Sequence, residues 1–321
     1  MSSWVASRRS DVVGHAWAAT HATAVRFRRC PLMKHLILDC MNFMHRARSG
    51  FALGEHAVTY NFFRNLRALV GTLEPDTVTV VLEGHPRDRH AEFPEYKANR
   101  EEKVDPSDPK SLARAAEMKT FYRQAEEAIA LLKSSFPVLT VRHPHYEADD
   151  TIYTLCKKFA VAPDEVVVAS NDTDFIQLLN EFPSDTLRLY SPHDKAYVEA
   201  PEYDYVTWKS LRGDPTDNIP NLPGVGNVTA LKAVGNPEFM TELLSREGHA
   251  VQFESNKRLI ALKEIPSDEF GLMELSGEKP DWVNIIGEFK EWGFKSIFKD
   301  KTWEKFRCTF EGLKPTRNIV S

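Results

Sequence analysis

The sequence predicts an α/β protein with a doubly wound, mostly parallel sheet, followed by a smaller helical region. Three observations support this fold class: short apolar segments alternate with amphipathic ones, acids follow the apolar segments, and the chain from about Tyr205 onward has a mainly helical pattern. Continuous apolar strands that alternate with helices are typical of a parallel sheet covered on both faces. The 321 residues, 42% of them hydrophobic, are enough for a substantial core.

The expected elements follow one another from Met33. Runs of apolar residues predict strands, and apolar residues at helical spacing predict helices. The strands are expected at residues 35–40, 76–84, 138–144 and 165–172, with a short hairpin at 186–191 and 196–200. The helices are expected at 60–75, where Gly71 and Pro75 are the stop signals, and at 111–136, 148–161 and 173–179.

Two boundaries complete the predicted organisation. Residues 85–110 are polar and punctuated by prolines, which favours a long loop or an irregular helical segment. We expect a core domain at residues 33–204 and a helical domain at residues 205–321.

The first 32 residues differ from the rest of the chain. They hold one acid, Asp11, against five arginines: Arg8, Arg9, Arg26, Arg28 and Arg29. An arginine-rich, acid-poor start is typical of a transit peptide. The alternative is an over-long gene model, since Met33 directly precedes the first expected strand, and we favour it. On either reading we expect this segment to be disordered or dispensable.

Charge and cysteine content narrow the class of protein. The net charge of −5 gives no overall basic surface, so a polyanionic partner would need local basic patches. The four cysteines are scattered without a CxxC pair, which favours a reducing compartment over a disulfide scaffold or a zinc site. No apolar run approaches the roughly 20 residues that a membrane-spanning helix needs, so no membrane association is expected.

Acidic side chains gather where the expected strands end. Seven acids fall in these places: Asp39, Glu83, Glu147, Asp149, Asp150, Asp172 and Asp174. The carboxyl ends of parallel strands form the edge at which ligands bind, so the seven acids are expected to lie together. Two more, Asp214 and Asp217 in "GDPTDN", are three residues apart and share one face of a helical turn.

Electrostatics decides what such a group of acids means. Taken singly, each acid is best read as a solvated loop residue, or as a helix-start residue in the case of positions 147–150. Two carboxylates 4 Å apart repel by about 4 kcal/mol at an effective dielectric near 20, so a large cluster needs cations to stay ionised. The all-oxygen set suits Mg²⁺ or Mn²⁺, and without histidine or cysteine it does not suit zinc.

Two further motifs indicate a phosphate-bearing ligand. In "NIPNLPGVGNVTALKAV", residues 218–234, Gly224 and Gly226 bracket a turn before a helix, as in a helix-hairpin-helix that binds a phosphate through backbone N–H groups. The alternative is an ordinary turn between two helices. In "EYKANR", Lys97 and Arg100 are one helical turn apart beside Tyr96, which suits a phosphate and a stacked base, although such a cation pair is commonly a solvated face.

Together these motifs resemble the 5′ nuclease (flap endonuclease) superfamily. The resemblance is to the 5′→3′ exonuclease domain of bacterial DNA polymerase I and to free-standing phage and bacterial 5′ nucleases, and it runs from about Met33 to about Lys305. It rests on "LILDCMNFMHRA", "VVLEGHPRDRHAEFPEYKANR", "YEADDTIYTL", "ASNDTDFIQLL" and "GDPTDNIPNLPGVGNVTA". It implies a PIN-like α/β core, a helical arch at about 87–125 and a helix-three-turn-helix DNA-binding element.

The resemblance also implies roles for individual residues. One metal group would be formed by Asp39, Glu83, Glu147, Asp149 and Asp150. The second would be formed or supported by Asp172, Asp174, Asp214 and Asp217. Lys97 and Arg100 would engage the scissile phosphate, Tyr96 would stack on a nucleotide, and Arg46 and Arg89 would contact DNA phosphates. A K⁺ ion at the Gly224–Gly226 hairpin is a further expectation from the family.

The resulting expectation is a nuclease that uses two or more Mg²⁺ or Mn²⁺ ions to hydrolyse DNA near 5′ flaps, nicks or ends. RNA–DNA primers are further substrates, a separate replicative polymerase is the expected partner, and a monomer in the cytoplasm of a bacterial or phage-infected cell is the expected state. The chain departs from the family pattern at Cys40, where glycine is usual, and at Glu83, where aspartate is usual.

Three other classes of protein are alternatives to this nuclease. A catalytically weak scaffold for branched DNA has only Glu83 in its favour. A PIN-type ribonuclease would be shorter and would lack the "LPGVG" element. A haloacid-type phosphatase would need a DxD after the first strand, where the chain has "DCMN".

Overall fold

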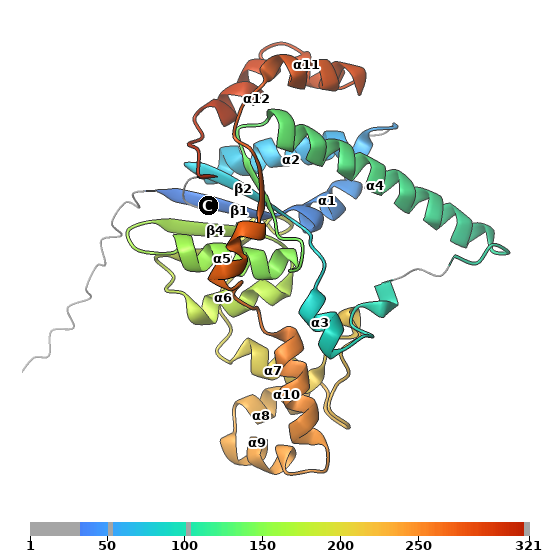
Figure 1. Cartoon of the computed structure of the whole chain (residues 1–321), viewed down its shortest axis with the longest axis vertical. Coiled ribbons are helices and arrows are strands. Elements are labelled where there is room, and N and C mark those ends of the chain that lie inside the picture. Colours follow the sequence, from blue (N-terminus) through green and yellow to red (C-terminus); the bar gives the residue numbers. More distant parts are fainter. Residues whose placement is uncertain (1–32, 51–53, 101–103, 318–321) are drawn as a thin grey trace, which may run out of the picture.

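The computed structural model describes residues 33–50, 54–100 and 104–317. Its centre is a seven-stranded sheet in the order β6-β5-β4-β1-β2-β3-β7 (Figure 1). The strands are β1 (Lys34–Asp39), β2 (Thr77–Leu82), β3 (Leu139–Arg142), β4 (Glu165–Ala169), β5 (Leu187–Ser191), β6 (Ala196–Tyr197) and β7 (Glu274–Gly277). The five inner strands are parallel, and both edge strands are antiparallel. The expected doubly wound, mostly parallel sheet is therefore confirmed.

Helices cover both faces of the sheet, as Figure 1 shows. One face carries α1 (Cys40–Arg48), α2 (Ala57–Leu73), α4 (Pro109–Ser135), α11 (Trp282–Glu291) and α12 (Thr302–Glu311), and the other carries α5 (Ala148–Phe159) and α6 (Ile176–Glu181). Side chains alternate across β1 accordingly: Leu36 and Leu38 join the first layer, whereas Ile37 joins the second. Because both faces are buried, β1 and β2 consist almost wholly of buried residues.

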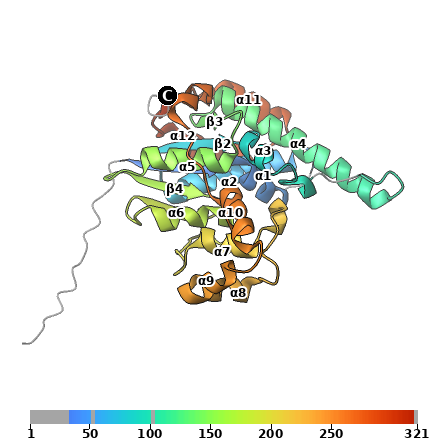
Figure 2. The ribbon, with the colours of Figure 1, turned by 60° about the horizontal axis from the view of Figure 1, so that its bottom comes forward.

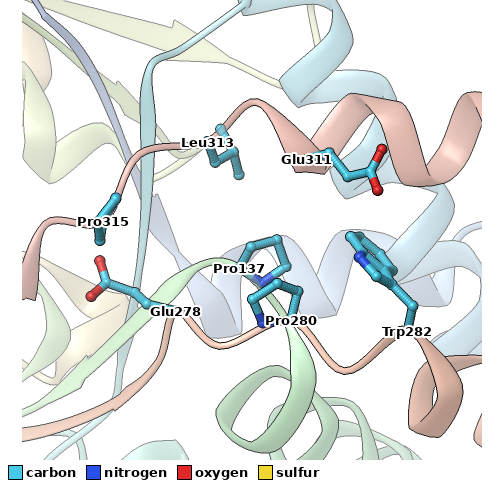
Figure 3. Close-up of a pocket in the computed structure, with 7 residues that line it drawn as sticks. All are labelled: Pro137, Glu278, Pro280, Trp282, Glu311, Leu313 and Pro315. Carbon is cyan, nitrogen blue, oxygen red and sulfur yellow. The ribbon is translucent and has the colours of Figure 1, made fainter.

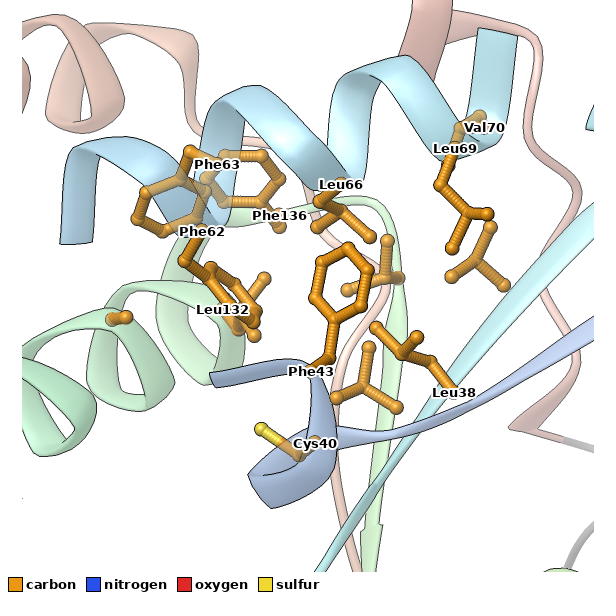
Figure 4. Close-up of a cluster of buried hydrophobic side chains, with 14 of the residues drawn as sticks. Leu38, Cys40, Phe43, Phe62, Phe63, Leu66, Leu69, Val70, Leu132 and Phe136 are labelled. Atoms are coloured by element: carbon orange, nitrogen blue, oxygen red, sulfur yellow. The ribbon is translucent and has the colours of Figure 1, made fainter. Parts of the chain in front are cut away.

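The larger core lies between the sheet and α2, α4, α11 and α12. It is rich in phenylalanine, and Phe63 stacks on Phe136 with ring centroids 4.9 Å apart (Figure 4). Cys40, which stands where the family usually has glycine, is fully buried in this core at the start of α1. Cys40 therefore contributes packing there, and burial raises the pKa of its thiol.

The segment that follows β2 leads out of the sheet into the region for which an arch is expected. It forms α3 (Arg87–Glu92) and the 3-10 turn η1 (Ala98–Arg100), in line with the irregular helical segment expected there. Helix α4 starts at the N-cap Asp108, with Pro109 at its first turn. Its first half projects beyond the sheet (Figures 1 and 2), and its second half packs on the core.

A small helical unit lies below the sheet in Figures 1 and 2. It contains α7 (Tyr205–Arg212), the 3-10 turn η3 (Pro215–Asp217), α8 (Asn227–Val234), α9 (Pro237–Leu244) and α10 (His249–Ile260). These helices share a core of their own, in which Leu211, Leu222 and Leu243 are fully buried. The unit stands at the edge of the sheet where the parallel strands end, so it can present its side chains to a ligand bound there.

Several features differ from the sequence predictions. Strand β7 pairs with β3 at the edge of the sheet. It was not predicted, because residues 205–321 have a mainly helical pattern and β7 is not a buried apolar segment. Helix α2 continues through Gly71 and ends at Leu73. Helix α1 was not anticipated. The expectations for residues 1–32 lie outside the described residues. In the part of the chain that the structure describes, no helix is long and apolar enough to cross a membrane.

Candidate active site

A pocket of about 660 Å³ opens at the carboxyl ends of β1, β2 and β4. Eight of the nine expected metal-binding acids line it: Asp39, Glu83, Glu147, Asp149, Asp172, Asp174, Asp214 and Asp217. Lys97 and Arg100 line the same pocket. The structure therefore brings together acids that lie up to 178 positions apart in the sequence (217 − 39), as the strand-end argument predicts.

Two acids each cap a helical turn at the pocket. The Asp39 carboxylate accepts a hydrogen bond from the Asn42 N–H at the start of α1 (3.1 Å), and also accepts one from the Ser170 hydroxyl (3.2 Å). Asp172 likewise accepts from the Asp174 N–H (2.9 Å) at the start of η2 (Thr173–Phe175). Each cap fixes the backbone of its acid and leaves lone pairs on the carboxylate for a ligand, so helix-start chemistry and metal binding are compatible here.

A close backbone contact brings Glu83 beside Glu147. A Cβ atom on Gly84 would lie 1.9 Å from the His143 carbonyl oxygen and 2.2 Å from that of Tyr146. Only glycine allows the end of β2 to approach so near to the loop that leads to Glu147. The longer Glu83 side chain thus reaches the same pocket as the acids of α5.

A tight loop presents the acids of "GDPTDN". Gly213 has φ +69°, and a Cβ atom there would lie 2.5 Å from the Asn221 nitrogen, so glycine is required. Asp214 and Ile219 exchange backbone hydrogen bonds across the loop at 2.9 and 2.8 Å. Carboxylate oxygens of Asp174, Asp214 and Asp217 then lie within 4.8 Å of one another, which suits ligation of one ion.

Three basic side chains interleave with the acids. Lys97 pairs with Glu147 and lies 3.8 Å from Asp217, and Arg100 pairs with Asp217. Lys209, on α7, is 4% exposed and pairs with Asp174 and with Asp214, the latter at 2.6 Å. Lys209 was not predicted from the sequence. The only sequence feature that could have indicated it is its position, five residues before Asp214 on the helix that precedes the acidic loop.

The ninth acid, Asp150, does not reach the pocket. Arg89, itself 4% exposed, binds Asp150 bidentately and donates to Glu147 at 2.9 Å. It also donates to the carbonyl oxygens of Leu259 (2.9 Å) and Ala261 (3.2 Å). Two predictions need correction: Asp150 is the partner of a buried guanidinium rather than a pocket ligand, and Arg89 is not available to DNA.

Tyr96 also differs from its prediction. Its side chain is 3% exposed, and its hydroxyl donates to Glu147 at 3.0 Å, with Asp217 at 3.2 Å. Its ring packs with Ile219 and Leu259. Tyr96 therefore orients two acids from the inside of the protein and offers no face to a base, because the ring that would stack is needed for packing.

The remaining DNA-binding predictions fall at the surface. Arg46 is half-buried on α1 and does not line the acidic pocket. Gly224 has φ +72°, Gly226 is the N-cap of α8, and no atom would lie within 4 Å of a Cβ atom on either one. The backbone of this hairpin is open to solvent just before a helix N-terminus, an arrangement that can accept a phosphate.

Burial changes the proton affinity of the acids. Loss of hydration, together with the nearby Asp172 charge, raises the pKa of Asp39 to about 6 and that of Asp174 to about 6. Glu83 is exposed at the pocket, yet the many protein atoms around it reduce its hydration and raise its pKa to about 7, with help from Glu147. Burial and Asp172 raise the pKa of Asp149 well above its usual range.

Glu147 and Asp214 behave in the opposite way. Burial acts to raise the pKa of Glu147, but Lys97 and Arg89 outweigh it and lower the pKa. For Asp214, burial is likewise outweighed by Lys209, and the pKa is lowered. Their cation partners keep these two acids ionised, whereas Asp39, Glu83, Asp149 and Asp174 need an added cation to ionise at low cost. The donor set thus fits divalent ions held by oxygen ligands.

The raised pKa values predict how stability responds to pH and metal. Asp39, Glu83 and Asp174 hold protons more tightly in the folded chain than in the unfolded one. Their contribution to the free energy of unfolding therefore falls as pH rises from about 4 to about 7. Mg²⁺ should reverse this loss, so the rise in melting temperature on adding Mg²⁺ should grow between about pH 5 and about pH 7.5.

Calorimetry at matched pH, with Mg²⁺ and with EDTA, checks this prediction. The difference between the two curves isolates the acidic pocket, because groups far from it contribute equally to both. A Mg²⁺ effect that stays constant or shrinks as the pH rises would contradict the prediction.

A second hollow, drawn in Figure 3, shares no lining residue with the acidic pocket. It measures about 470 Å³ and is lined by Pro137, Glu278, Pro280, Trp282, Glu311, Leu313 and Pro315. The Glu278 carboxylate accepts hydrogen bonds from the hydroxyl of Thr316 (3.0 Å) and from the N–H of Arg317 (3.1 Å). This hollow is where the C-terminal segment closes on the core, and it contains no constellation of reactive groups.

Taken together, the chain is an α/β protein with an acidic, cation-lined pocket at the carboxyl edge of a parallel sheet. A family model described as the 5′-3′ exonuclease, N-terminal resolvase-like domain, matches residues 34–204. This match covers more than half of the chain, so the chain belongs to the 5′-3′ exonuclease family.

Relatives and solved structures agree with this assignment. The chain is 27% identical to a 5′-3′ exonuclease of Aquifex aeolicus over 293 residues, which cover 82% of this chain and 93% of that one. It is 30% identical to DNA polymerase I of Treponema pallidum over 212 residues, 60% of this chain and 20% of the polymerase. The chain thus spans about a fifth to a third of the DNA polymerase I chains that it matches.

The fold is shared with a phage protein. The D15 flap endonuclease of bacteriophage T5, solved with DNA and metal ions, has a TM-score of 0.59 at 19% identity. The alignment covers 87% of this chain and 98% of the phage protein. At this level of identity the likeness establishes the fold, and the chemistry has to be argued from the pocket.

Proposed function

We propose that this chain is a structure-specific 5′ nuclease, a 5′→3′ exonuclease and flap endonuclease that hydrolyses phosphodiesters near the 5′ end of branched or duplex DNA. The observation that carries the proposal is the convergence of eight acids with Lys97 and Arg100 in one pocket at the carboxyl edge of the sheet. The names of its relatives support the same activity. We further propose that it acts as a cytoplasmic monomer beside a separate polymerase.

Two Mg²⁺ or Mn²⁺ ions are proposed as cofactors. Asp39, Glu83, Glu147 and Asp149 would hold one, and Asp172, Asp174 and Asp217, supported by Asp214, would hold the other. Such ions supply a hydroxide nucleophile at neutral pH and neutralise charge on the phosphate.

The basic side chains at the pocket have separate roles in the proposal. Lys97 and Arg100 orient the scissile phosphate by charge-assisted hydrogen bonds. Lys97 has φ +57°, and its N–H donates to the Asp217 carbonyl at 3.0 Å, so its backbone is fixed in an unusual conformation at the pocket. The Gly224–Gly226 hairpin would bind the duplex backbone without sequence preference, with a K⁺ ion bound at the hairpin.

Cleavage of an end-labelled 5′-flap duplex tests the proposal. The wild-type protein should cut at the flap junction with Mg²⁺ or Mn²⁺ and be inactive in EDTA. The products should carry a 5′-phosphate and a 3′-hydroxyl, which end-labelling reads directly. Nicked, gapped and RNA-primed duplexes in parallel would set the substrate preference. Tight binding of branched DNA with no cutting in either metal would favour the scaffold alternative, and cutting of RNA alone would favour a ribonuclease.

A further inference from the structure

One aromatic side chain at the acidic pocket is not used by the mechanism above. Tyr122, on α4, lines the pocket and has 49% of its surface exposed. Among the described residues, no other Phe, Tyr or Trp is exposed to this extent. Large aromatic side chains are usually buried. An exposed tyrosine at a charged pocket therefore points to a ligand with an apolar face.

The backbone at Tyr122 is held in place by packing, although the Tyr122 side chain is exposed. The preceding residue, Phe121, is 2% exposed and stacks on His45 with ring centroids 4.6 Å apart. The Arg48 guanidinium lies over the Phe121 ring, 5.2 Å from its centroid, and the Tyr122 ring meets Phe121 edge-on with centroids 5.2 Å apart. Helix α4 is therefore anchored in the core at the point where Tyr122 leaves it. The ring is presented by a fixed backbone and not by a mobile loop.

The chemistry of the pocket defines what this ring can bind. A nucleotide whose phosphate lies over the acids carries its base only a sugar away, and the carboxylates and ammonium groups offer that base no apolar surface. Base–aromatic stacking is tolerant of sequence and is worth about 1–3 kcal/mol per base. Paired bases are already stacked in the duplex, so an unpaired base has the most to gain.

We propose that Tyr122 is the stacking surface for the unpaired base next to the phosphate held at the acidic pocket. This inference rests on the proposed function, because it requires a single-stranded 5′ segment at the pocket. It replaces the sequence-based expectation for Tyr96, whose ring is buried. Tyr122 is a positioning residue: it holds the strand and takes no part in the chemical step.

Fluorescence of 2-aminopurine at the first unpaired nucleotide of a flap duplex tests the inference. Ca²⁺ replaces Mg²⁺ in this experiment, because its longer ligand distances disfavour turnover. The wild-type protein and Tyr122→Phe should quench the fluorescence on binding, whereas Tyr122→Ala should leave it close to that of free DNA. Tyr122→Ala should also weaken binding of the flap duplex by roughly 5- to 100-fold.

A duplex of the same sequence without the flap is the matched control, and its affinity should not change in Tyr122→Ala. Full quenching by Tyr122→Ala, or an equal loss of affinity for both duplexes, would overturn the inference. If the wild-type protein cuts flaps and either of these results is found, the nuclease proposal stands and the stacking role is rejected. If the wild-type protein does not bind flap DNA at all, the proposed function fails first.

Discussion

Replacing Asp172 with asparagine should reduce flap cleavage by roughly a thousandfold or more. Asp172 lies where the two groups of acids meet, and its charge acts on Asp39, Asp149 and Asp174 together. Removing one ligand from a site that binds two ions forfeits several kcal/mol of transition-state stabilisation, and each 1.4 kcal/mol is about a factor of ten in rate. Single-turnover cleavage of the flap duplex in saturating Mg²⁺ measures the loss.

The asparagine side chain separates a chemical effect from a structural one. It can still accept the Asp174 N–H that Asp172 accepts at 2.9 Å, so the capped turn is retained. In EDTA the variant should unfold at a higher temperature than the wild type, because one of several repelling charges is gone. Asp185→Asn, at an exposed position in a loop, is the control and should change neither property. An active Asp172→Asn enzyme would argue against the two-metal assignment.

The parts of the site that follow from chain topology could be predicted from sequence. An acid at the end of a buried parallel strand, or within a few residues after it, has to lie near the carboxyl edge, and this is true of Asp39, Glu83 and Asp172 alike. Asp214 and Asp217 were placed by the spacing of their loop. Glu83 remains in the pocket although aspartate is usual, because Gly84 lets the strand end approach the loop before Glu147.

The parts that depend on tertiary burial could not be predicted. Asp149 and Asp150 are adjacent on α5, and the rotation of about 100° between neighbouring helix residues directs the first to the pocket and the second to Arg89. An arginine that is buried in the fold cannot be distinguished by sequence from one that binds DNA, because both are charged residues in a polar segment. Tyr96 was misjudged and Lys209 was missed for this reason: Tyr96 donates to Glu147 and Lys209 pairs with Asp174, and each of these partners is more than 30 residues away in the sequence.

The second large effect is expected at Arg89, and it concerns stability. Arg89→Met would leave Glu147 and Asp150 as buried charges without this partner, and would leave the carbonyl oxygens of Leu259 and Ala261 unpaired. Removing one member of a buried ion pair typically costs about 3–5 kcal/mol. Since about 1 kcal/mol shifts the melting temperature of a large domain by roughly 2–4 °C, the variant should melt roughly 6–20 °C lower. Thermal unfolding at neutral pH measures this change.

Arg87→Met is the matched control two positions away. The Arg87 side chain is 48% exposed and pairs with Asp88 and Glu269 at the surface, where such pairs contribute about 0–1 kcal/mol. A large loss at Arg89 with little change at Arg87 would establish that the guanidinium joins α3, α5 and the end of α10 into one unit. The opposite result, in which Arg89→Met folds with normal stability but binds flap DNA weakly, would restore Arg89 as a phosphate contact. The two roles therefore separate cleanly, since a buried structural cation is measured by melting and a surface contact by the salt dependence of DNA binding.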